Sequence, residues 1–236
     1  MATKAPTAAQ PAASRAPLSR SRVLGAALAI VDVEGLDALT MRRLGEQLGA
    51  DPMSVYRHVE GKDALLDGLS DTLWAEVPGP KAGAHWPDAL RAFARSIRAV
   101  FHRHPQAAPL MIRRFLTRSA LEVSHAYLQA LRDAGFAGTR AAEVIRSVVS
   151  YSVGYGLQEV GFPAIPQTPG RRATAGREFL VSLGQALPAG TPAHLVETAI
   201  ALCADCNPDD CFEFGLELIV GGIRQLQPSE GGRRTG

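Results

Sequence analysis

The chain has 236 residues, which is long enough to bury a sizeable core, either as one large domain or as a small domain followed by a medium-sized one. Its residues are 46% hydrophobic and 20% charged, and its formal net charge is +2, which is too small to indicate nucleic-acid binding by itself. No stretch is long and apolar enough to span a bilayer or to form a signal-peptide core, and three cysteines do not make the disulfide framework of a secreted protein. We therefore expect a cytoplasmic protein with no membrane contact.

Residues 1–17 are rich in Ala, Pro, Thr and Ser and are predicted to form a disordered basic arm. Four basic residues precede the first acidic residue, Asp32: Lys4, Arg15, Arg20 and Arg22. A basic arm ahead of a DNA-binding unit can add contacts to phosphates or to the minor groove. The alternative is a solvated tail without a partner, and we prefer it for residues 1–16.

A first helix is predicted from Leu18 to Glu34. Its apolar residues repeat at the spacing of one helix face: Leu24, Ala27, Leu28 and Val31. Gly35 is a suitable stop, and a short loop then leads to Thr40, which suits a helix N-cap.

The stretch from Thr40 to Lys62, TMRRLGEQLGADPMSVYRHVEGK, is typical of two short helices joined by a tight turn. Gly49 ends the first helix. Asp51 and Pro52 open the second, because an aspartate can accept a free first-turn amide and a proline needs no donor there. Each helix has a narrow apolar stripe, formed by Met41, Leu44 and Leu48 and by Val55 and Val59. The other residues of the second helix are mostly polar, so the pattern predicts a helix-turn-helix whose second helix enters the major groove of DNA.

The rest of the chain shows helical patterns only, which predicts an all-α fold. A fourth helix at about 62–76 completes the first unit, and the Pro/Gly-rich residues 77–84 mark the best internal boundary. The helix at 139–161 is the least polar and needs cover on nearly all sides. Further helices are expected at about 86–104, 107–115, 119–134 and 208–226, with a loop at 162–172 and moderately helical segments at 175–187 and 192–205.

Several motifs together resemble the TetR family of transcriptional regulators. In the N-terminal part these are Leu39-Thr40, Leu44…Leu48-Gly49, Tyr56-x-His58-Val59, and Gly61-Lys62-Asp63 followed by Leu65-Leu66. In the C-terminal part they are Trp86-x-x-x-Leu90, the region from Gly154 to Glu159, and Phe212-x-Phe214-Gly215-Leu216-Glu217-Leu218-Ile219. The C-terminal motifs resemble the ligand-binding domain of the tetracycline-repressor type, although this match is looser. The resemblance extends from Leu18 to Leu226.

The resemblance implies an all-helical homodimer with two domains and a tail. An N-terminal three-helix helix-turn-helix domain at 18–77 would bind DNA, a larger helical domain at 78–227 would bind a ligand and dimerise, and residues 228–236 would be a disordered tail. The apolar helices at 139–161 and 208–226 would then form a four-helix interface between two copies. The alternative is that both are core helices of a monomer, and the resemblance favours the dimer.

The resemblance also implies nine DNA-binding residues: Thr40, Arg42, Pro52, Met53, Ser54, Tyr56, Arg57, His58 and Lys62. Arg42, Ser54 and Arg57 are the expected base readers, since an arginine can bind guanine through two acceptors in the major groove. Met53 suits a thymine methyl, Tyr56 a phosphate, and Lys62 a phosphate at the start of a helix. His58 could equally contact DNA or pack inside, and Arg43 is expected to be a solvated side chain.

The predicted ligand-binding residues are an apolar set with a few polar groups, which suits a hydrophobic or amphipathic effector. They are Trp74, Phe93, Ile97, Phe101, Met111, Phe115, Tyr151, Tyr155, Gln158 and Glu159. Taken singly, most are more often plain core residues. Relatives that bind tetracycline present polar or metal-coordinating groups where this chain has Phe93 and Met111. We therefore expect no tetracycline–magnesium chemistry, no metal and no cofactor.

The three cysteines, Cys203, Cys206 and Cys211, form a C-x2-C-x4-C pattern near the last helix. Three thiolates could bind zinc or act as a redox pair, but a structural zinc site needs four ligands and no fourth lies nearby in sequence. Buried, inert cysteines are the preferred interpretation. No glycine-rich phosphate loop, nucleophile elbow or H-E-x-x-H motif is present, so an enzyme is not predicted.

The sequence leaves three hypotheses of function. The first is a homodimeric repressor that a small effector releases from a palindromic operator. The second keeps the fold but replaces the small ligand by a protein partner or by cysteine oxidation, and the protein could then be an activator. The third, an enzyme that uses the apolar cavity for turnover, has no support beyond the cavity itself.

Overall fold

The structure is a computed structural model that describes residues 17–161, 188, 190–203 and 207–226, without the side chains of residues 199–203. All its regular elements are helices, which confirms the predicted all-α fold for this part of the chain. In order they are α1 (Arg20–Glu34), the 3-10 helix η1 (Leu36–Ala38), α2 (Met41–Leu48), α3 (Pro52–Tyr56), α4 (Lys62–Ala75), α5 (Trp86–Arg103), α6 (Leu110–Arg113), α7 (Arg118–Asp133), α8 (Gly138–Gly161), α10 (Ala193–Cys203) and α11 (Pro208–Gln225).

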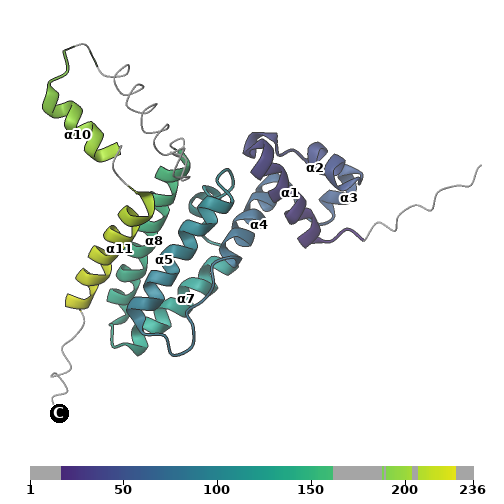
Figure 1. Cartoon of the computed structure of the whole chain (residues 1–236). Coiled ribbons are helices and arrows are strands. Elements are labelled where there is room, and N and C mark those ends of the chain that lie inside the picture. Colours follow the sequence, from purple (N-terminus) through teal and green to yellow (C-terminus); the bar gives the residue numbers. More distant parts are fainter. Residues whose placement is uncertain (1–16, 162–187, 189, 204–206, 227–236) are drawn as a thin grey trace, which may run out of the picture.

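The N-terminal helices form a small unit around their own apolar residues. α1 begins at Arg20 because the hydroxyl of Ser19 accepts a hydrogen bond from the Arg22 amide at 3.3 Å, and it ends at Gly35, whose φ is 86°. Val31, Leu44 and Leu69, from three different helices, are fully buried. Figure 1 shows that α4 leaves this unit and runs into the rest of the molecule. The position of α4 therefore couples the two parts.

The larger part is a bundle in which α5, α7, α8 and α11 lie side by side, with α10 standing away from it (Figure 1). α5 and α8 approach closely at Gly156, where a Cβ atom would lie 2.7 Å from Cγ of Phe101. The bundle core is aromatic, and Phe93 stacks on Tyr127 with ring centroids 4.1 Å apart. None of the helices in the described ranges is long and apolar enough to cross a membrane.

Several predicted helices are shorter in the structure than the sequence indicated. The recognition helix α3 ends at Tyr56, residues 57–58 form a turn, and residues 59–61 form a bend. The helix expected at 107–115 is only Leu110–Arg113, since Pro109 precedes it and the backbone leaves the helical region at Arg114. The predicted loop at 162–172, the helical segment at 175–187 and both terminal tails, except residue 17, lie outside the described residues.

Candidate nucleic-acid interface and effector region

The turn between α2 and α3 depends on two glycines. Gly49 has a φ of 60°, in the left-handed region that side chains disfavour. A Cβ atom at Gly45 would lie 2.9 Å from the carbonyl oxygen of Ala50, and the Ala50 amide donates a hydrogen bond to the Gly45 carbonyl at 2.9 Å. The chain therefore folds back tightly over Gly45. Sequence reasoning identified Gly49 but missed Gly45, although the two glycines are four residues apart.

The recognition helix is fixed by one cap and by one apolar face. The Asp51 carboxylate accepts a hydrogen bond from the Met53 amide at 2.8 Å, as predicted for an N-cap. Val55 and Val59 are buried against the unit. The remaining side of this short segment is open: Met53 is 69% exposed, and Tyr56 and Arg57 are also exposed, while Pro52, Ser54 and His58 are half-buried. An apolar face thus fixes the helix and leaves the polar residues accessible.

The cations of the helix-turn-helix differ in how far they are already paired. Arg42 is exposed, with only a 3.7 Å ion pair to Glu46. Within the described ranges, Arg57 and Lys62 have no ion pair, and Lys62 is the first residue of α4, whose N-cap Gly61 supplies no side-chain cap. Thr40 is exposed, but its hydroxyl already accepts a hydrogen bond from the Arg43 amide at 3.1 Å. Arg57 and Lys62 therefore have charges available for phosphates or bases.

Arg43 is not the solvated side chain that the sequence suggested. Its guanidinium contacts the Glu34 carboxylate at 2.5 Å and the Gln47 side chain at 3.2 Å. The hydrogen bond from Arg43 lowers the pKa of Glu34, and the same bond raises the pKa of Arg43. Arg43 thus braces α2 against the end of α1.

Five of the ten predicted ligand-binding residues are buried in the bundle: Trp74, Phe93, Ile97, Phe101 and Met111. Trp74 donates a hydrogen bond from Nε1 to the Met111 carbonyl at 3.2 Å, and its ring meets Phe115 edge-on at 6.4 Å. Two hollows stand out in the described residues, and neither is lined by any of these five side chains. Their role as ligand contacts stays a prediction.

Tyr151, Tyr155 and Glu159 lie together at the contact between α8 and α11. The Tyr151 hydroxyl donates to the Phe212 carbonyl at 2.7 Å, and the Tyr155 hydroxyl donates to the Pro208 carbonyl at 2.8 Å. Burial raises the pKa of Tyr151 to about 12, so it stays a donor at neutral pH. Gly215 permits this approach, since a Cβ atom there would meet the Tyr151 hydroxyl. Both tyrosines therefore fasten the start of α11 to α8.

Arg98 of α5 occupies the centre of this cluster. It binds Glu159 through two hydrogen bonds of 2.5 and 2.8 Å and Asp209 at 2.8 Å, and its guanidinium lies 4.8 Å from the Phe212 ring centroid. Burial raises the pKa of Glu159, but hydrogen bonds from Arg98 and His102 outweigh it, so the pKa lies below its ordinary value. Glu159 is thus already satisfied inside the protein. The other predicted polar contact, Gln158, is exposed.

A ladder of ion pairs joins α5 to α11. Arg91 binds Glu217 at 2.5 Å and Arg95 binds Glu213 at 2.7 Å, and the Arg98–Asp209 pair continues the row. The acids recur every four residues on α11, so they share one face. Sequence reasoning missed these ion pairs, because their partners lie more than 100 residues away in the chain.

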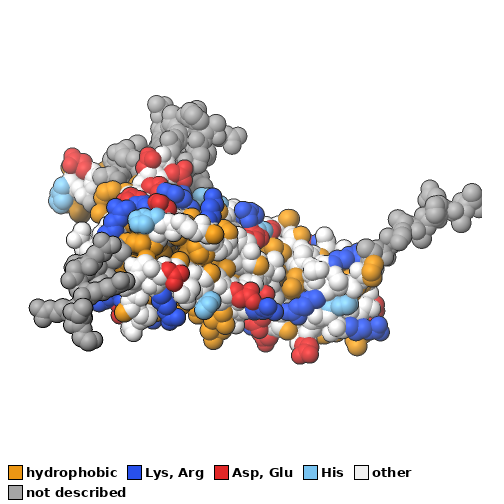
Figure 2. Space-filling model, turned by 90° about the horizontal axis from the view of Figure 1, so that it is seen from below, with side chains coloured by type: hydrophobic (Ala, Val, Ile, Leu, Met, Phe, Trp, Pro, Cys, Tyr) orange, Lys and Arg blue, Asp and Glu red, His pale blue; other side chains and the backbone are white. Residues whose placement is uncertain are grey.

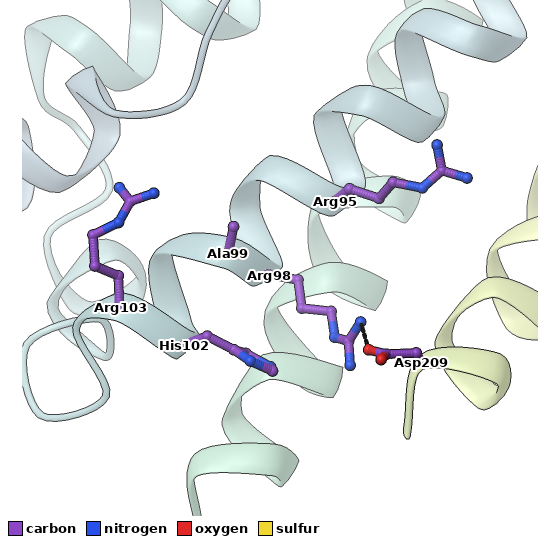
Figure 3. A pocket seen from close by; sticks show the side chains of 6 residues that line it. All are labelled: Arg95, Arg98, Ala99, His102, Arg103 and Asp209. Atoms are coloured by element: carbon purple, nitrogen blue, oxygen red, sulfur yellow. Dashed lines mark ion pairs between the residues drawn. The ribbon is translucent and has the colours of Figure 1, made fainter. Parts of the chain in front are cut away.

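The two hollows differ in lining. The first, about 420 Å³, is lined by Arg95, Arg98, Ala99, His102, Arg103 and Asp209. Figure 3 shows Arg98 directed at Asp209, with Arg95 and Arg103 pointing in different directions, so these cations do not converge on one point. The second, about 560 Å³, is a groove between the N-terminal unit and the residues after α6, and Phe115 is the predicted ligand-binding residue that lines it. Neither is an enclosed apolar cavity.

The segment 111–119 is joined to α4 by a polar seam. Arg114 binds Asp63 at 2.6 Å and Asp67 at 2.8 Å. The Ser70 hydroxyl donates to the Arg114 carbonyl at 2.9 Å, and the Asp71 carboxylate accepts from the Ser119 amide at 2.7 Å. Because these bonds follow one side of α4, any displacement of segment 111–119 acts directly on the helix that carries Lys62.

Cys211 is disulfide-bonded and half-buried, which differs from the inert buried thiol that we expected. The side chains of Cys203 and Cys206 lie outside the described residues. Among the side chains that the structure describes, no group of three or more His, Cys, Asp or Glu residues could hold a metal ion.

Comparisons with known proteins match both parts of the chain. A family model described as "Bacterial regulatory proteins, tetR family" matches residues 23–69, and one described as "Tetracyclin repressor-like, C-terminal domain" matches residues 79–227. The HTH-type transcriptional repressor DrrR1 of Streptomyces coeruleorubidus is 32% identical over 217 residues, which are 89% of this chain and 78% of that protein. The class C tetracycline repressor of Escherichia coli is 27% identical over 89% of this chain and 92% of its own length. The crystal structure of the TetR family protein ActR of Streptomyces coelicolor with actinorhodin superposes with a TM-score of 0.71 at 30% identity, covering 91% of this chain and 99% of that one.

Proposed function

Because the chain belongs to the TetR family of DNA-binding transcriptional regulators, we propose that it is a homodimeric repressor which a small hydrophobic or amphipathic effector releases from a palindromic operator. The DNA-binding domain is residues 18–77 and the ligand-binding and dimerisation domain is residues 78–227. Its place of action is the cytoplasm, where the DNA is.

The arrangement of cations in the helix-turn-helix carries the DNA-binding part of this proposal. Arg57 and Lys62 are exposed and lack an ion pair within the described ranges, while the neighbouring Arg43 is bound to Glu34. Arg42, Ser54 and Arg57 read bases, Met53 contacts a thymine methyl, and Tyr56 and Lys62 contact phosphates. Thr40, Pro52 and His58 complete the contact surface.

The dimer is supported by apolar side chains that α8 and α11 leave exposed. Leu157 lies on α8, Phe214 and Leu218 lie on α11, and Leu226 follows it. Figure 2 shows apolar side chains among charged ones on the half of the molecule formed by the C-terminal helices. Two copies that pair α8 with α11 bury these residues in a two-fold symmetric four-helix interface.

The effector enters the bundle beside α5 and α8 and binds among the predicted apolar residues, with Tyr151, Tyr155, Gln158 and Glu159 as the polar contacts. The ligand-bound ActR structures support a small organic effector for a relative. In this chain the buried Phe93 and Met111 replace the polar groups of the tetracycline-binding relatives, which argues against a tetracycline–magnesium complex. An effector shifts the equilibrium only if it binds the form without DNA more tightly.

Operator selection from random DNA with the full-length protein tests the proposal. The expected result is a palindromic site, bound by the wild type and bound at least about fivefold more weakly by Arg57→Ala, since one good base contact contributes about 1–3 kcal/mol. Arg140→Ala is the matched control, because Arg140 lies on α8 and, within the described residues, its ion pair is with the neighbouring Glu143. Failure of the wild type to enrich any site would overturn the proposal. A screen in which every compound that binds the bundle leaves operator affinity unchanged would overturn the effector part.

The bonded state of Cys211 favours a second candidate, a regulator of the same fold that is controlled by cysteine oxidation. Replacing Cys203, Cys206 and Cys211 by serine separates the two candidates. Loss of redox-dependent regulation with intact operator binding would support thiol control. Unchanged regulation would exclude it.

A further inference from the structure

The last turn of α5 reaches across to the DNA-binding unit through one histidine. His104 follows the last residue of α5, and its side chain is only 10% exposed. Its Nδ1 lies 2.8 Å from Oδ2 of Asp32 in α1, and its Nε2 lies 3.0 Å from Oε1 of Glu76 at the end of α4. One imidazole therefore holds together the end of an effector-domain helix and two helices of the DNA-binding unit.

The two hydrogen bonds define the charge that this bridge needs. Ionised carboxylates only accept hydrogen bonds, so both ring nitrogens must carry a proton for both bonds to form. That form is the imidazolium, which balances part of the charge of Asp32 and Glu76. Arg103 also pairs with Glu76, from the exposed side. A neutral imidazole would turn a nitrogen lone pair towards one carboxylate and lose that bond.

Asp32 depends strongly on this contact. Its other carboxylate oxygen, Oδ1, is buried and has no hydrogen-bond partner in the described part of the chain. A half-buried carboxylate with one buried oxygen is costly to leave without its partner, so the end of α1 would have to move towards water if the contact with His104 were lost. The geometry thus links the charge of one side chain to the placement of a whole helix.

The contact continues from α1 into the helix-turn-helix. Two residues after Asp32, Glu34 binds Arg43 of α2 at 2.5 Å. The sequence of contacts runs from His104 to the end of α1 and from there to α2, which packs against the recognition helix. This route is separate from the polar seam between α4 and segment 111–119.

We propose that His104 is a positioning residue that fixes the DNA-binding unit on the end of α5 through its two hydrogen bonds, and that operator binding depends on this bridge. The inference deepens the proposed function, and its prediction for operator affinity rests on that function. When the bridge is lost, the DNA-binding unit samples orientations that do not match both half-sites, and the apparent affinity falls in proportion. The groups that face His104 are Asp32 and Glu76, with Arg103 bound to Glu76.

The test compares His104→Gln with His102→Gln in the full-length protein. His102 is a matched control: it is a histidine two residues earlier, in the last turn of α5, it is 51% exposed, and its Nε2 contacts Glu159 of the bundle at 2.8 Å. Operator affinity is measured by fluorescence anisotropy at constant pH and ionic strength. His104→Gln should bind the operator about fivefold or more weakly than the wild type. His102→Gln should bind like the wild type, and an operator affinity of His104→Gln equal to that of the wild type would overturn the proposal.

A second readout needs no DNA. Amide hydrogen exchange at residues 31–43 should be faster in His104→Gln than in the wild type and in His102→Gln. Asp32→Asn should give the same local effect, and the double variant should exceed neither single variant, because both remove one contact. Unchanged exchange in both single variants would overturn the proposal. If amide exchange at residues 31–43 becomes faster in the variants but operator selection finds no DNA site, the role of His104 is supported and the proposed function fails.

Discussion

Replacing Phe214 and Leu218 of α11 by lysine should convert the protein from a dimer to a monomer. The two side chains are 67% and 62% exposed in a single copy, and they lie four residues apart on one face of the helix. Lysine is preferred to aspartate because Glu213 and Glu217 already bind Arg95 and Arg91, and another acid would compete for those arginines. The substitution therefore acts on the outer face of α11 and leaves its contact with α5 intact.

The magnitude follows from the exposed area. Full burial of a leucine or phenylalanine contributes about 1.5–3 kcal/mol, so burial of the two-thirds left open here contributes roughly 1–2 kcal/mol per side chain. A two-fold interface contains both residues from each of the two copies, so burial of the four side chains contributes roughly 4–8 kcal/mol. Since 1.4 kcal/mol is a factor of ten, the dimer dissociation constant should rise by roughly three to six powers of ten.

Sedimentation velocity at micromolar protein, together with operator binding, measures this change. The variant should sediment as a monomer and lose the tight binding that needs both half-sites. Leu116→Lys is the control, because Leu116 is 80% exposed but lies between α6 and α7. A double variant that remains a dimer at the wild-type dissociation constant would refute the assignment of α11 to the interface, and so would a wild type that is monomeric.

Three further predictions concern the DNA contacts, the turn and the ion-pair ladder. Lys62→Ala should weaken operator binding about equally for all sequences and reduce the slope of log affinity against log salt by about one; an unchanged slope would exclude a phosphate contact. Gly45→Ala should destabilise the protein by about 1–3 kcal/mol, because its Cβ would meet a backbone oxygen, whereas Gly25→Ala in α1, which has open space, should stabilise by up to about 1 kcal/mol. Thermal unfolding of both variants decides this, and equal shifts would contradict it. Hydrogen bonds from arginines of α5 lower the pKa values of Glu213 and Glu217 below their ordinary value of 4.5. The two ion pairs therefore contribute to stability above pH 4.5, and this contribution is lost as the pH falls through the lowered pKa values. Acid unfolding of Glu213→Gln/Glu217→Gln should accordingly depend less on pH than that of the wild type, and identical curves would argue against the ladder.

The helix-turn-helix could be predicted from the sequence because its determinants are local. A proline after an N-cap aspartate and a glycine in the left-handed region act within a few residues of their position, and Asp51 and Gly49 do so in the structure. Gly45 escaped prediction because its role is a close contact with the Ala50 carbonyl. Such a contact becomes apparent only when the turn has been built.

The effector region could be predicted only in outline, because its arrangement depends on pairs of helices that are distant in sequence. The ladder between Arg95 and Glu213 requires the register of α5 against α11, which no local pattern specifies. Five predicted ligand-binding residues are buried and Phe115 is exposed, and burial alone does not distinguish a core from a cavity. Phe93 illustrates this, since its stacking on Tyr127 fills space that a ligand would otherwise occupy.

The two contacts between the domains also constrain how an effector can act. α4 is held by Arg114 and its neighbours along one side, and α1 is held by His104 at the end of α5. A displacement of α4 alone would strain the shared contact of His104 with Glu76, which ends α4. In the proposed dimer the DNA-binding unit would therefore turn as one body, and an effector would have to move α5 and segment 111–119 together to change the spacing of the two recognition helices. An effector that reached only one of these elements would leave the other contact opposing it, so productive effectors should be large enough to touch both α5 and the residues around Met111.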